Sequence, residues 1–223
     1  MKCSLYFLLL LFSVCSLEAQ LAPAHKPIVP LQPPDLIKLL PPTPNGWEMK
    51  ESKAKSFYNE WLVSQASRQF VQPQPPSSSA GPGGQRPPQI THLRLTDTGF
   101  NPALFGDFEQ FKAGKYGNTE SLSFNAFPAR RITFADGERL RILIKARFIV
   151  EVETHNQAPN AAMLWAKQFD FSRLNSIPDA GVEKLANPLT VFSIDELNPK
   201  ANSSYQVSWS TQEDLDAARK RKP

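Results

Sequence analysis

The architecture of this chain is clearest in residues 130–154, which read RRITFADGERLRILIKARFIVEVET. Apolar and charged residues alternate here with a period of two, as expected for strands that bury one face. A three-residue loop at residues 145–147 would place Ile142 opposite Val150, with the even-numbered positions buried together. We therefore predict a β-meander with one apolar face.

The same register makes a prediction for the other face of the meander. Arg141 falls opposite Glu151 and Arg139 falls opposite Glu153, so opposite charges meet in cross-strand pairs. Exposed ion pairs contribute only about 0 to 1 kcal/mol each, whereas each buried apolar side chain contributes about 1.5 to 3 kcal/mol. The apolar face therefore sets the register, and the charges accompany it.

A second hairpin is predicted immediately before this one. Residues 135–137 are Ala, Asp and Gly, which suit a three-residue loop with the glycine in the left-handed conformation. Such a loop places Ile132 opposite Leu140 and Phe134 opposite Glu138. The even-numbered residues would again share the buried face.

Helices are predicted before and after the meander in the sequence. Asn160 is suited to cap a helix that carries Trp165, and this helix should cover the apolar face. Residues 47–71 place large apolar residues at helical spacing, so an amphipathic helix is predicted there, and another is predicted from Asn101. The predicted fold class is α+β, an antiparallel β-meander sheet packed against helices.

Composition divides the rest of the chain. Residues 20–46 contain eight prolines, which fix φ and remove hydrogen-bond donors, so a proline-rich extended arm is predicted. Residues 72–89 are rich in proline, serine and glycine and are predicted to form a disordered linker. The α+β domain is predicted to span residues 90–218, followed by a basic tail at residues 219–223.

The first 19 residues have the features of a secretory signal peptide. A positive start precedes an apolar run at residues 5–14, and cleavage is predicted after Ala19. The expected location is therefore secreted or periplasmic. Two alternatives stay open: the apolar run is retained as an anchor, or Cys15 is acylated.

Several chemistries lack the residues that they need. Both cysteines lie in the signal, at positions 3 and 15, which excludes thiol catalysis and cysteine-rich zinc sites from the mature chain. The net charge of +4 is too weak to indicate nucleic-acid binding. His25, His92 and His155 share no metal-ligand spacing, and no serine-hydrolase or phosphate-loop motif occurs. No catalytic residue, metal site or cofactor is predicted.

Two runs carry a resemblance: FPARRITFADGERLRILIKARFIVEVE at residues 127–153 and LWAKQFDFSRL at residues 164–174. They resemble exported bacterial α+β domains of unknown function, in which a β-meander ends in a helix. The resemblance covers residues 119–177. It implies an α+β fold and an envelope location, and it carries no catalytic residue across.

The expected function is that of an exported, non-catalytic cell-envelope protein, a protein-binding or ligand-binding module. The candidate surface is the exposed meander face: Arg139, Arg141, Leu143, Ile149, Glu151 and Glu153. Leu143 and Ile149 are unusual for a fully solvated face, and a helix covering that face would remove the candidate surface. The expected partner is an unknown envelope protein or a small ligand. Nucleic acid is not expected, and the membrane is expected only if the signal is retained or Cys15 is acylated.

The alternative function is a carboxylate-dependent hydrolase that acts on an envelope polysaccharide. Its candidates are two pairs of neighbouring acids, Asp107 with Glu109 and Asp195 with Glu196, which would have to meet another acid in space. A glycosidase of this kind needs two carboxyl groups about 5 to 9.5 Å apart in a concave site.

Overall fold

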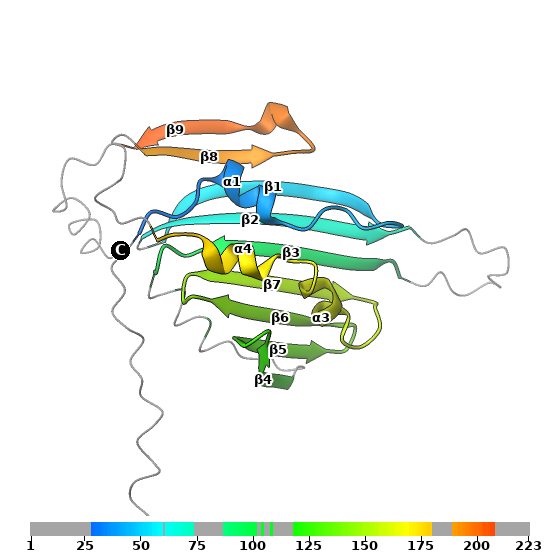
Figure 1. Ribbon diagram of the computed structural model, residues 1–223. Helices are drawn as coiled ribbons and strands as arrows, with labels where there is room; N and C mark the ends of the chain where they lie inside the picture. The colour runs from blue at the N-terminus through cyan, green and yellow to red at the C-terminus, as the bar shows by residue number, and fades with distance from the viewer. Residues whose placement is uncertain are drawn as a thin grey trace, which may run out of the picture.

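Nine strands form one antiparallel sheet in the part of the chain that the structure describes (Figure 1). The computed structural model describes residues 28–59, 61–73, 87–101, 104, 108, 118–179 and 189–207. The strand order is β4-β5-β6-β7-β3-β2-β1-β8-β9. The strands are β1 (Glu48–Asn59), β2 (Trp61–Gln72), β3 (Gln89–Asp97), β4 (Asn118–Phe124), β5 (Phe127–Phe134), β6 (Gly137–Ile144), β7 (Phe148–His155), β8 (Leu189–Asp195) and β9 (Ser203–Val207).

Short helices pack on one side of this sheet, which we call the inner face, and the opposite side is the outer face (Figure 1). The helices on the inner face are α1 (Pro33–Leu36), η1 (Ile37–Leu39), α3 (Ala161–Ala166) and α4 (Phe171–Ser176). A further short helix, η3 (Pro199–Ala201), lies between β8 and β9.

The predicted α+β class is wrong, because the described residues are 52% strand and only 17% helix. The main cause is residues 47–71, predicted as an amphipathic helix, which form the antiparallel hairpin of β1 and β2. On β1, Ser52 and Ala54 are buried, whereas Lys53 and Lys55 are exposed. This alternation is hard to recognise because the inward residues are small, so the larger apolar residues suggested a helical period. The folded domain therefore begins well before the predicted boundary.

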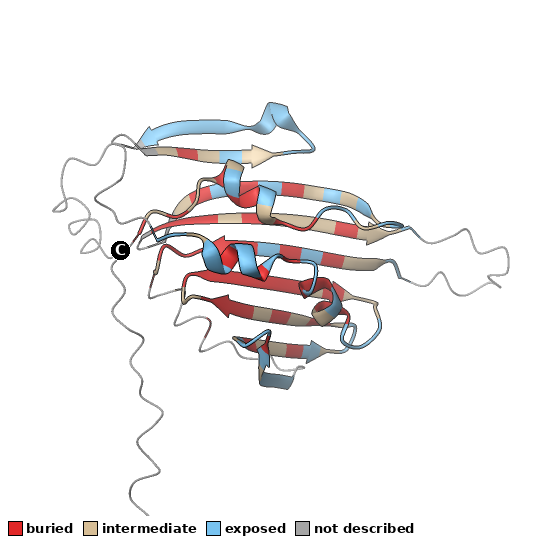
Figure 2. Ribbon diagram, in the orientation of Figure 1, coloured by how far each residue is buried: buried red, intermediate tan, exposed pale blue. Residues whose placement is uncertain are grey.

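The core lies between the inner face and the helices, as the band of buried residues in Figure 2 shows. Ile142 and Val150 are fully buried, and Trp165 covers the sheet, as predicted. The Trp165 indole stacks on Phe70 with ring centroids 5.3 Å apart and meets Trp47 edge-on at 4.9 Å. Burial of each large apolar side chain contributes about 1.5 to 3 kcal/mol. This cluster therefore holds the helical layer against the sheet.

The β6–β7 hairpin has the predicted register. The three predicted cross-strand pairs form: Ile142 with Val150, Arg141 with Glu151, and Arg139 with Glu153. Lys145 and Ala146 in the connecting loop both have φ of 54°, the left-handed conformation that such a tight connection requires. The prediction of this hairpin is confirmed.

The β5–β6 hairpin is displaced by one residue from the predicted register. Its loop is a two-residue turn at residues 135–136, so Arg131 pairs with Leu140. Gly137 is the first residue of β6 and not a left-handed loop residue. A Cβ at Gly137 would lie 1.8 Å from the carbonyl oxygen of Thr154, so close backbone approach explains the glycine. The displacement also turns Arg131 to the inner face.

Residues 28–46 form an N-terminal strap on the inner face, where an extended arm was predicted. Leu36 and Ile37 in the strap are buried in the core. Pro33 is the first residue of α1, where a missing N–H is tolerated and the fixed φ suits the helix. Proline here begins a helix, and the prediction of an extended arm is wrong for these residues.

A buried ion pair ties the strap to the sheet. The Arg147 guanidinium donates from Nε and Nη2 to the two carboxylate oxygens of Asp97, at 3.0 and 2.7 Å. Asp97 also accepts from the backbone N–H of Leu31 in the strap, at 2.8 Å. Arg147 also donates from Nη1 to the carbonyl oxygen of Pro178, at 2.9 Å. The pair therefore joins the strap, β3, the β6–β7 loop and the segment after α4.

Other domain predictions lie outside the described residues. These are the signal peptide at residues 1–19, the basic tail at residues 219–223 and the central part of the linker, residues 74–86. The ends of the predicted linker, residues 72 and 89, belong to β2 and β3.

Candidate functional site

The predicted binding surface lies on the outer face, across β6 and β7. Its charged side chains pair across the strands together with Arg94 of β3. Glu151 binds both Arg141 and Arg94, the latter at 2.9 Å, and Glu153 binds Arg139. We call this set the charged ladder: Arg94, Arg139, Arg141, Glu151 and Glu153. Each of its two carboxylates is bound by at least one arginine of the sheet.

The two apolar residues of the predicted surface are not exposed. Leu143 and Ile149 are only 5% and 8% exposed, and they cluster with Phe108, which is itself buried. A residue of this same chain therefore covers them. Leu143 and Ile149 therefore do not form an exposed docking surface. The charged residues of the predicted surface stay a prediction: Arg139, Arg141, Glu151 and Glu153.

His155 lies where the charged ladder reaches the β5–β6 turn. Its Nδ1 is 3.0 Å from the Asp136 carboxylate, and its Nε2 is 2.9 Å from that of Glu153. Burial lowers the pKa of His155, but the hydrogen bonds to these two carboxylates outweigh it and raise the pKa above its ordinary value. The hydrogen bond to His155 in turn lowers the pKa of Asp136.

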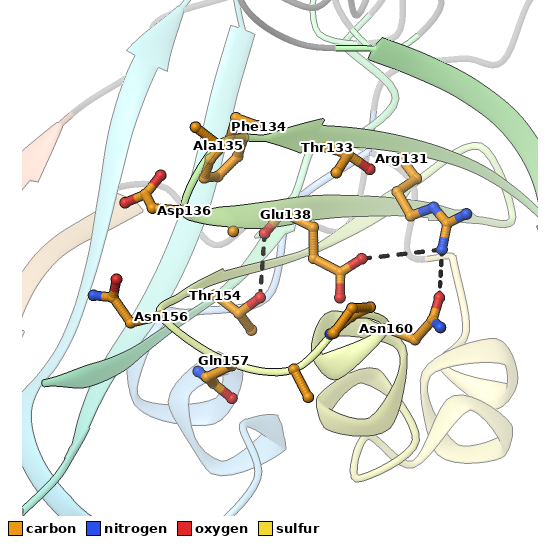
Figure 3. Close-up of a pocket in the computed structure, with 13 residues that line it drawn as sticks. Arg131, Thr133, Phe134, Ala135, Asp136, Glu138, Thr154, Asn156, Gln157 and Asn160 are labelled. Atoms are coloured by element: carbon orange, nitrogen blue, oxygen red, sulfur yellow. Dashed lines mark hydrogen bonds and ion pairs between the residues drawn. The ribbon is translucent and has the colours of Figure 1, made fainter. Parts of the chain in front are cut away.

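A polar hollow lies at the end of the sheet beside the β5–β6 turn (Figure 3). Its volume is about 510 Å³, within the range of small-molecule sites. Its floor includes Thr133, Glu138 and Thr154, which are paired neighbours on three adjacent strands. Its wall is the loop of residues 156–160, which joins β7 to α3. We call it the end pocket.

Glu138 is the central group of the end pocket. Its side chain is 7% exposed, and its Oε1 accepts from the backbone N–H of Ala162 in the first turn of α3, at 2.9 Å. Its Oε2 lies 4.0 Å from Nη1 of Arg131, which is too far for a direct hydrogen bond. A carboxylate oxygen has two lone pairs, so Glu138 retains acceptor capacity toward the hollow (Figure 3).

Arg131 forms one side of the end pocket and is held by three neighbours, one of which is Met163, whose Sδ lies 3.8 Å from Nη1 of Arg131. Its Nη1 donates to Oδ1 of Asn160 at 2.7 Å, and its Nε donates to Glu120 on β4 at 3.0 Å. Asn160 has a φ of 66°, which asparagine tolerates better than most residues. The Asn160 side chain, predicted to cap α3, makes no capping hydrogen bond and binds Arg131 instead.

Gln157 braces the wall of the end pocket. Its Nε2 donates to the carbonyl oxygen of Ile90 and to the hydroxyl of Thr91, both at 2.7 Å. Its Oε1 accepts from Nε1 of Trp165 at 3.2 Å. Because Trp165 is anchored in the core, the loop is fixed on two sides and the pocket is preformed.

The sequence-based prediction includes neither Glu138 nor Arg131 among its site residues. The predicted register of the β5–β6 hairpin put Arg131 on the outer face, whereas the observed register pairs it with Leu140 and places it on the inner face. The signal that was present is the inward series of β6, in which Glu138 is followed by Leu140, Ile142 and Ile144. A charged residue in such a series is costly to bury, so it marks a candidate site.

The acids considered for hydrolysis make structural contacts. Asp195 accepts from the backbone N–H of Leu197 at 3.0 Å and closes a turn. Glu196 accepts from Nη2 of Arg68 at 2.9 Å. The other pair of candidate acids, Asp107 and Glu109, lies outside the described residues, and so does His25.

Comparison with known proteins gives no match, whether with protein-family models, curated proteins or solved structures. Across the described ranges, no helix has the length and apolar character to cross a membrane. Within the same ranges, no group of three or more His, Cys, Asp or Glu residues could hold a metal ion. Function is therefore inferred from the geometry of the end pocket.

Proposed function

We propose that this protein is an exported, non-catalytic binding module whose small ligand occupies the end pocket. The observation that carries this proposal is Glu138, a buried carboxylate that faces a preformed hollow. An apolar residue at this position would extend the inward series of β6 at no desolvation cost, as Leu140 does. Glu138 instead places a charge among buried apolar residues. Folded proteins depart from apolar packing in this way mainly at functional sites.

The bracing of the pocket supports binding. Gln157 is tied to β3 and Trp165, and Arg131 is tied to Asn160 and β4. A ligand would therefore enter without ordering the wall or the guanidinium, which reduces the entropic cost of association.

An NMR fragment screen on the full chain tests this proposal. Polar fragments are expected to shift the backbone resonances of Thr133, Gly137 and Asn160. Replacement of the exposed mouth residue by Ala158→Trp should abolish these shifts, whereas Gln206→Trp on the distant edge strand β9 should leave them unchanged. Shifts that are equal in both variants, or absent for every fragment, would contradict the proposal.

One observation favours the hydrolase as a second candidate: Asp136 and Glu138 both line the end pocket. Their contacts favour binding instead. The hydrogen bond from His155 lowers the pKa of Asp136, whereas a general acid needs a raised pKa. Glu138 already accepts from Ala162. Cleavage of an envelope polysaccharide that is lost in both Asp136→Asn and Glu138→Gln would reverse this preference.

Export is part of the proposal and is supported by the signal-like residues 1–19. Sequencing of the mature N-terminus tests it. A chain that begins at Gln20 agrees with a secreted or periplasmic protein. An intact N-terminus, or a lipid on Cys15, would instead place the protein on a membrane.

A further inference from the structure

We infer that the ligand of the end pocket is a neutral, hydroxyl-rich molecule, a saccharide unit; this rests on the proposed function above. The first step concerns charge. The lining contains one cation, Arg131, and two carboxylates, Asp136 and Glu138. A third carboxylate, Glu120, is bonded to the same guanidinium. An anionic ligand would therefore meet more negative than positive charge.

A cationic ligand meets the opposite difficulty. A group that binds Oε2 of Glu138 lies at most about 7 Å from Nη1 of Arg131, because a hydrogen bond of about 3 Å adds to the 4.0 Å between these two atoms. A guanidinium is a donor that carries positive charge and accepts no hydrogen bond. An ammonium group would therefore be repelled at short range by Arg131.

A hydroxyl group fits between these two side chains. It donates its proton to Glu138 and accepts from Nη1 of Arg131 with the same oxygen, in place of the weak contact between that Nη1 and Sδ of Met163 at 3.8 Å. Two hydrogen bonds of about 2.7 to 3.0 Å span the 4.0 Å separation when the oxygen lies to one side of the line between them. A carboxylate or an ammonium group satisfies only one of the two.

The rest of the lining suits further hydroxyls on a compact ring. Thr133 is exposed directly opposite Glu138, and its hydroxyl can donate or accept. The apolar residues that line the pocket are Phe134, Ala135, Ala158 and Pro159. A saccharide combines hydroxyl groups with apolar C–H faces, and this lining offers partners for both.

The test is an NMR titration of the full chain with named probes. The neutral probes are glucose, galactose, N-acetylglucosamine, cellobiose and chitobiose; the charged probes are ethylamine and inorganic phosphate. At least one neutral probe is expected to shift Thr133 and Gly137 in a saturable way, and neither charged probe should do so. Thr133→Ala should weaken that binding about threefold to tenfold, and Glu138→Gln about tenfold or more. Ser204→Ala, on the far edge strand β9, should leave the affinity unchanged.

The outcomes separate the ligand class from the site. If ethylamine or phosphate binds and no saccharide does, the saccharide inference is wrong, but the end pocket is still a binding site. The same conclusion follows if fragments bind and none of the saccharides does. If neither fragments nor probes reach the pocket, the inference and the proposed function both fail. Glu138 also holds α3, so misfolding of the Glu138→Gln variant has to be checked, and a disturbed spectrum would reveal it. In that case the affinity of the Thr133→Ala variant decides whether the inference holds, because Thr133 is exposed.

Discussion

The same sheet carries charge in two contrasting settings. Asp97 and Arg147 are 0% and 2% exposed, and their pair joins four segments of the chain. On the outer face, Arg139 and Glu153 are 35% and 20% exposed and connect only two neighbouring strands. Water solvates the second pair and is excluded from the first. Loss of one partner therefore costs much more stability in the buried pair than in the exposed pair. The contribution of a charged residue to the stability of this fold therefore depends more on its burial than on the number of ion pairs.

The largest effect is expected at the buried pair. Arg147→Met leaves the Asp97 carboxylate buried without its cation, which should reduce the free energy of unfolding by about 3 to 5 kcal/mol. Urea unfolding followed by circular dichroism measures this loss. The exposed cation Arg173 on α4 gives a control, because Arg173→Met should change stability by no more than about 0.5 kcal/mol. Losses of similar size in the two variants would show that the contrast between buried and exposed charge is wrong.

Glu138 lies between the two settings, and its removal should have an intermediate effect. Glu138→Ala leaves the Ala162 N–H without its acceptor, which should cost about 1 to 3 kcal/mol. Hydrogen exchange should show the amides of α3 exchanging faster. Glu120→Ala is the control, since that side chain is 56% exposed. Unchanged protection of α3 in Glu138→Ala would contradict the structural role given to this carboxylate.

The charged ladder should give a smaller effect. Arg139→Ala and Glu153→Ala, combined in a double-mutant cycle, should yield a coupling of about 0 to 1 kcal/mol. The coupling should fall in 1 M salt, where the Debye length is about 3 Å. A coupling free energy larger than the loss of stability in Arg147→Met would contradict the view that the buried pair contributes more than the exposed pair.

The smallest effect is expected from the titration of His155. Its raised pKa means that the folded state favours the protonated ring. This stabilisation is fully present below about pH 6.5, and it is lost as the pH rises through the folded pKa. His155→Gln should therefore lower the urea midpoint more at pH 5.5 than at pH 8.5. The opposite trend would show that the carboxylates around His155 do not govern its charge.

His92 provides the matched control on the adjacent strand. Burial lowers its pKa, so the folded state favours the neutral ring. The stability that depends on neutral His92 is present above about pH 6.5 and is lost as the pH falls through the folded pKa. His92→Gln should therefore raise the urea midpoint at pH 5.5 relative to its effect at pH 8.5. This trend with pH is opposite to the one expected for His155→Gln.

The sequence predicts the β6–β7 hairpin because large apolar residues fill one face of both strands without interruption. Any other register would expose several of them, so a single solution exists. The β1–β2 hairpin lacks this property. Its inward positions include Ser52, Ala54 and Ser56, whose burial contributes little, and the contacts that select the strand come from β3 and β8. Tertiary context overrides local pattern there.

The end pocket was not predictable in full for a related reason. Glu138 was visible as a charge at the end of an apolar series. Its partner Arg131 depended on whether the turn at residues 135–136 had two or three residues, which shifts every side chain of β5 to the other face. Asn160 depended on a left-handed conformation that the sequence only permits. The predicted outer surface failed in its apolar part because Phe108 covers it.

The N-terminal strap has a consequence for the order of assembly. Ile28 at its start hydrogen-bonds to Gly99, and Leu31 binds the carboxylate that Arg147 neutralises. During synthesis, the strap leaves the ribosome long before these partners exist, so it cannot dock until the β6–β7 loop has been made. Closure between such distant segments makes folding slow. The contacts of the strap therefore form late, only after Arg147 has been synthesised.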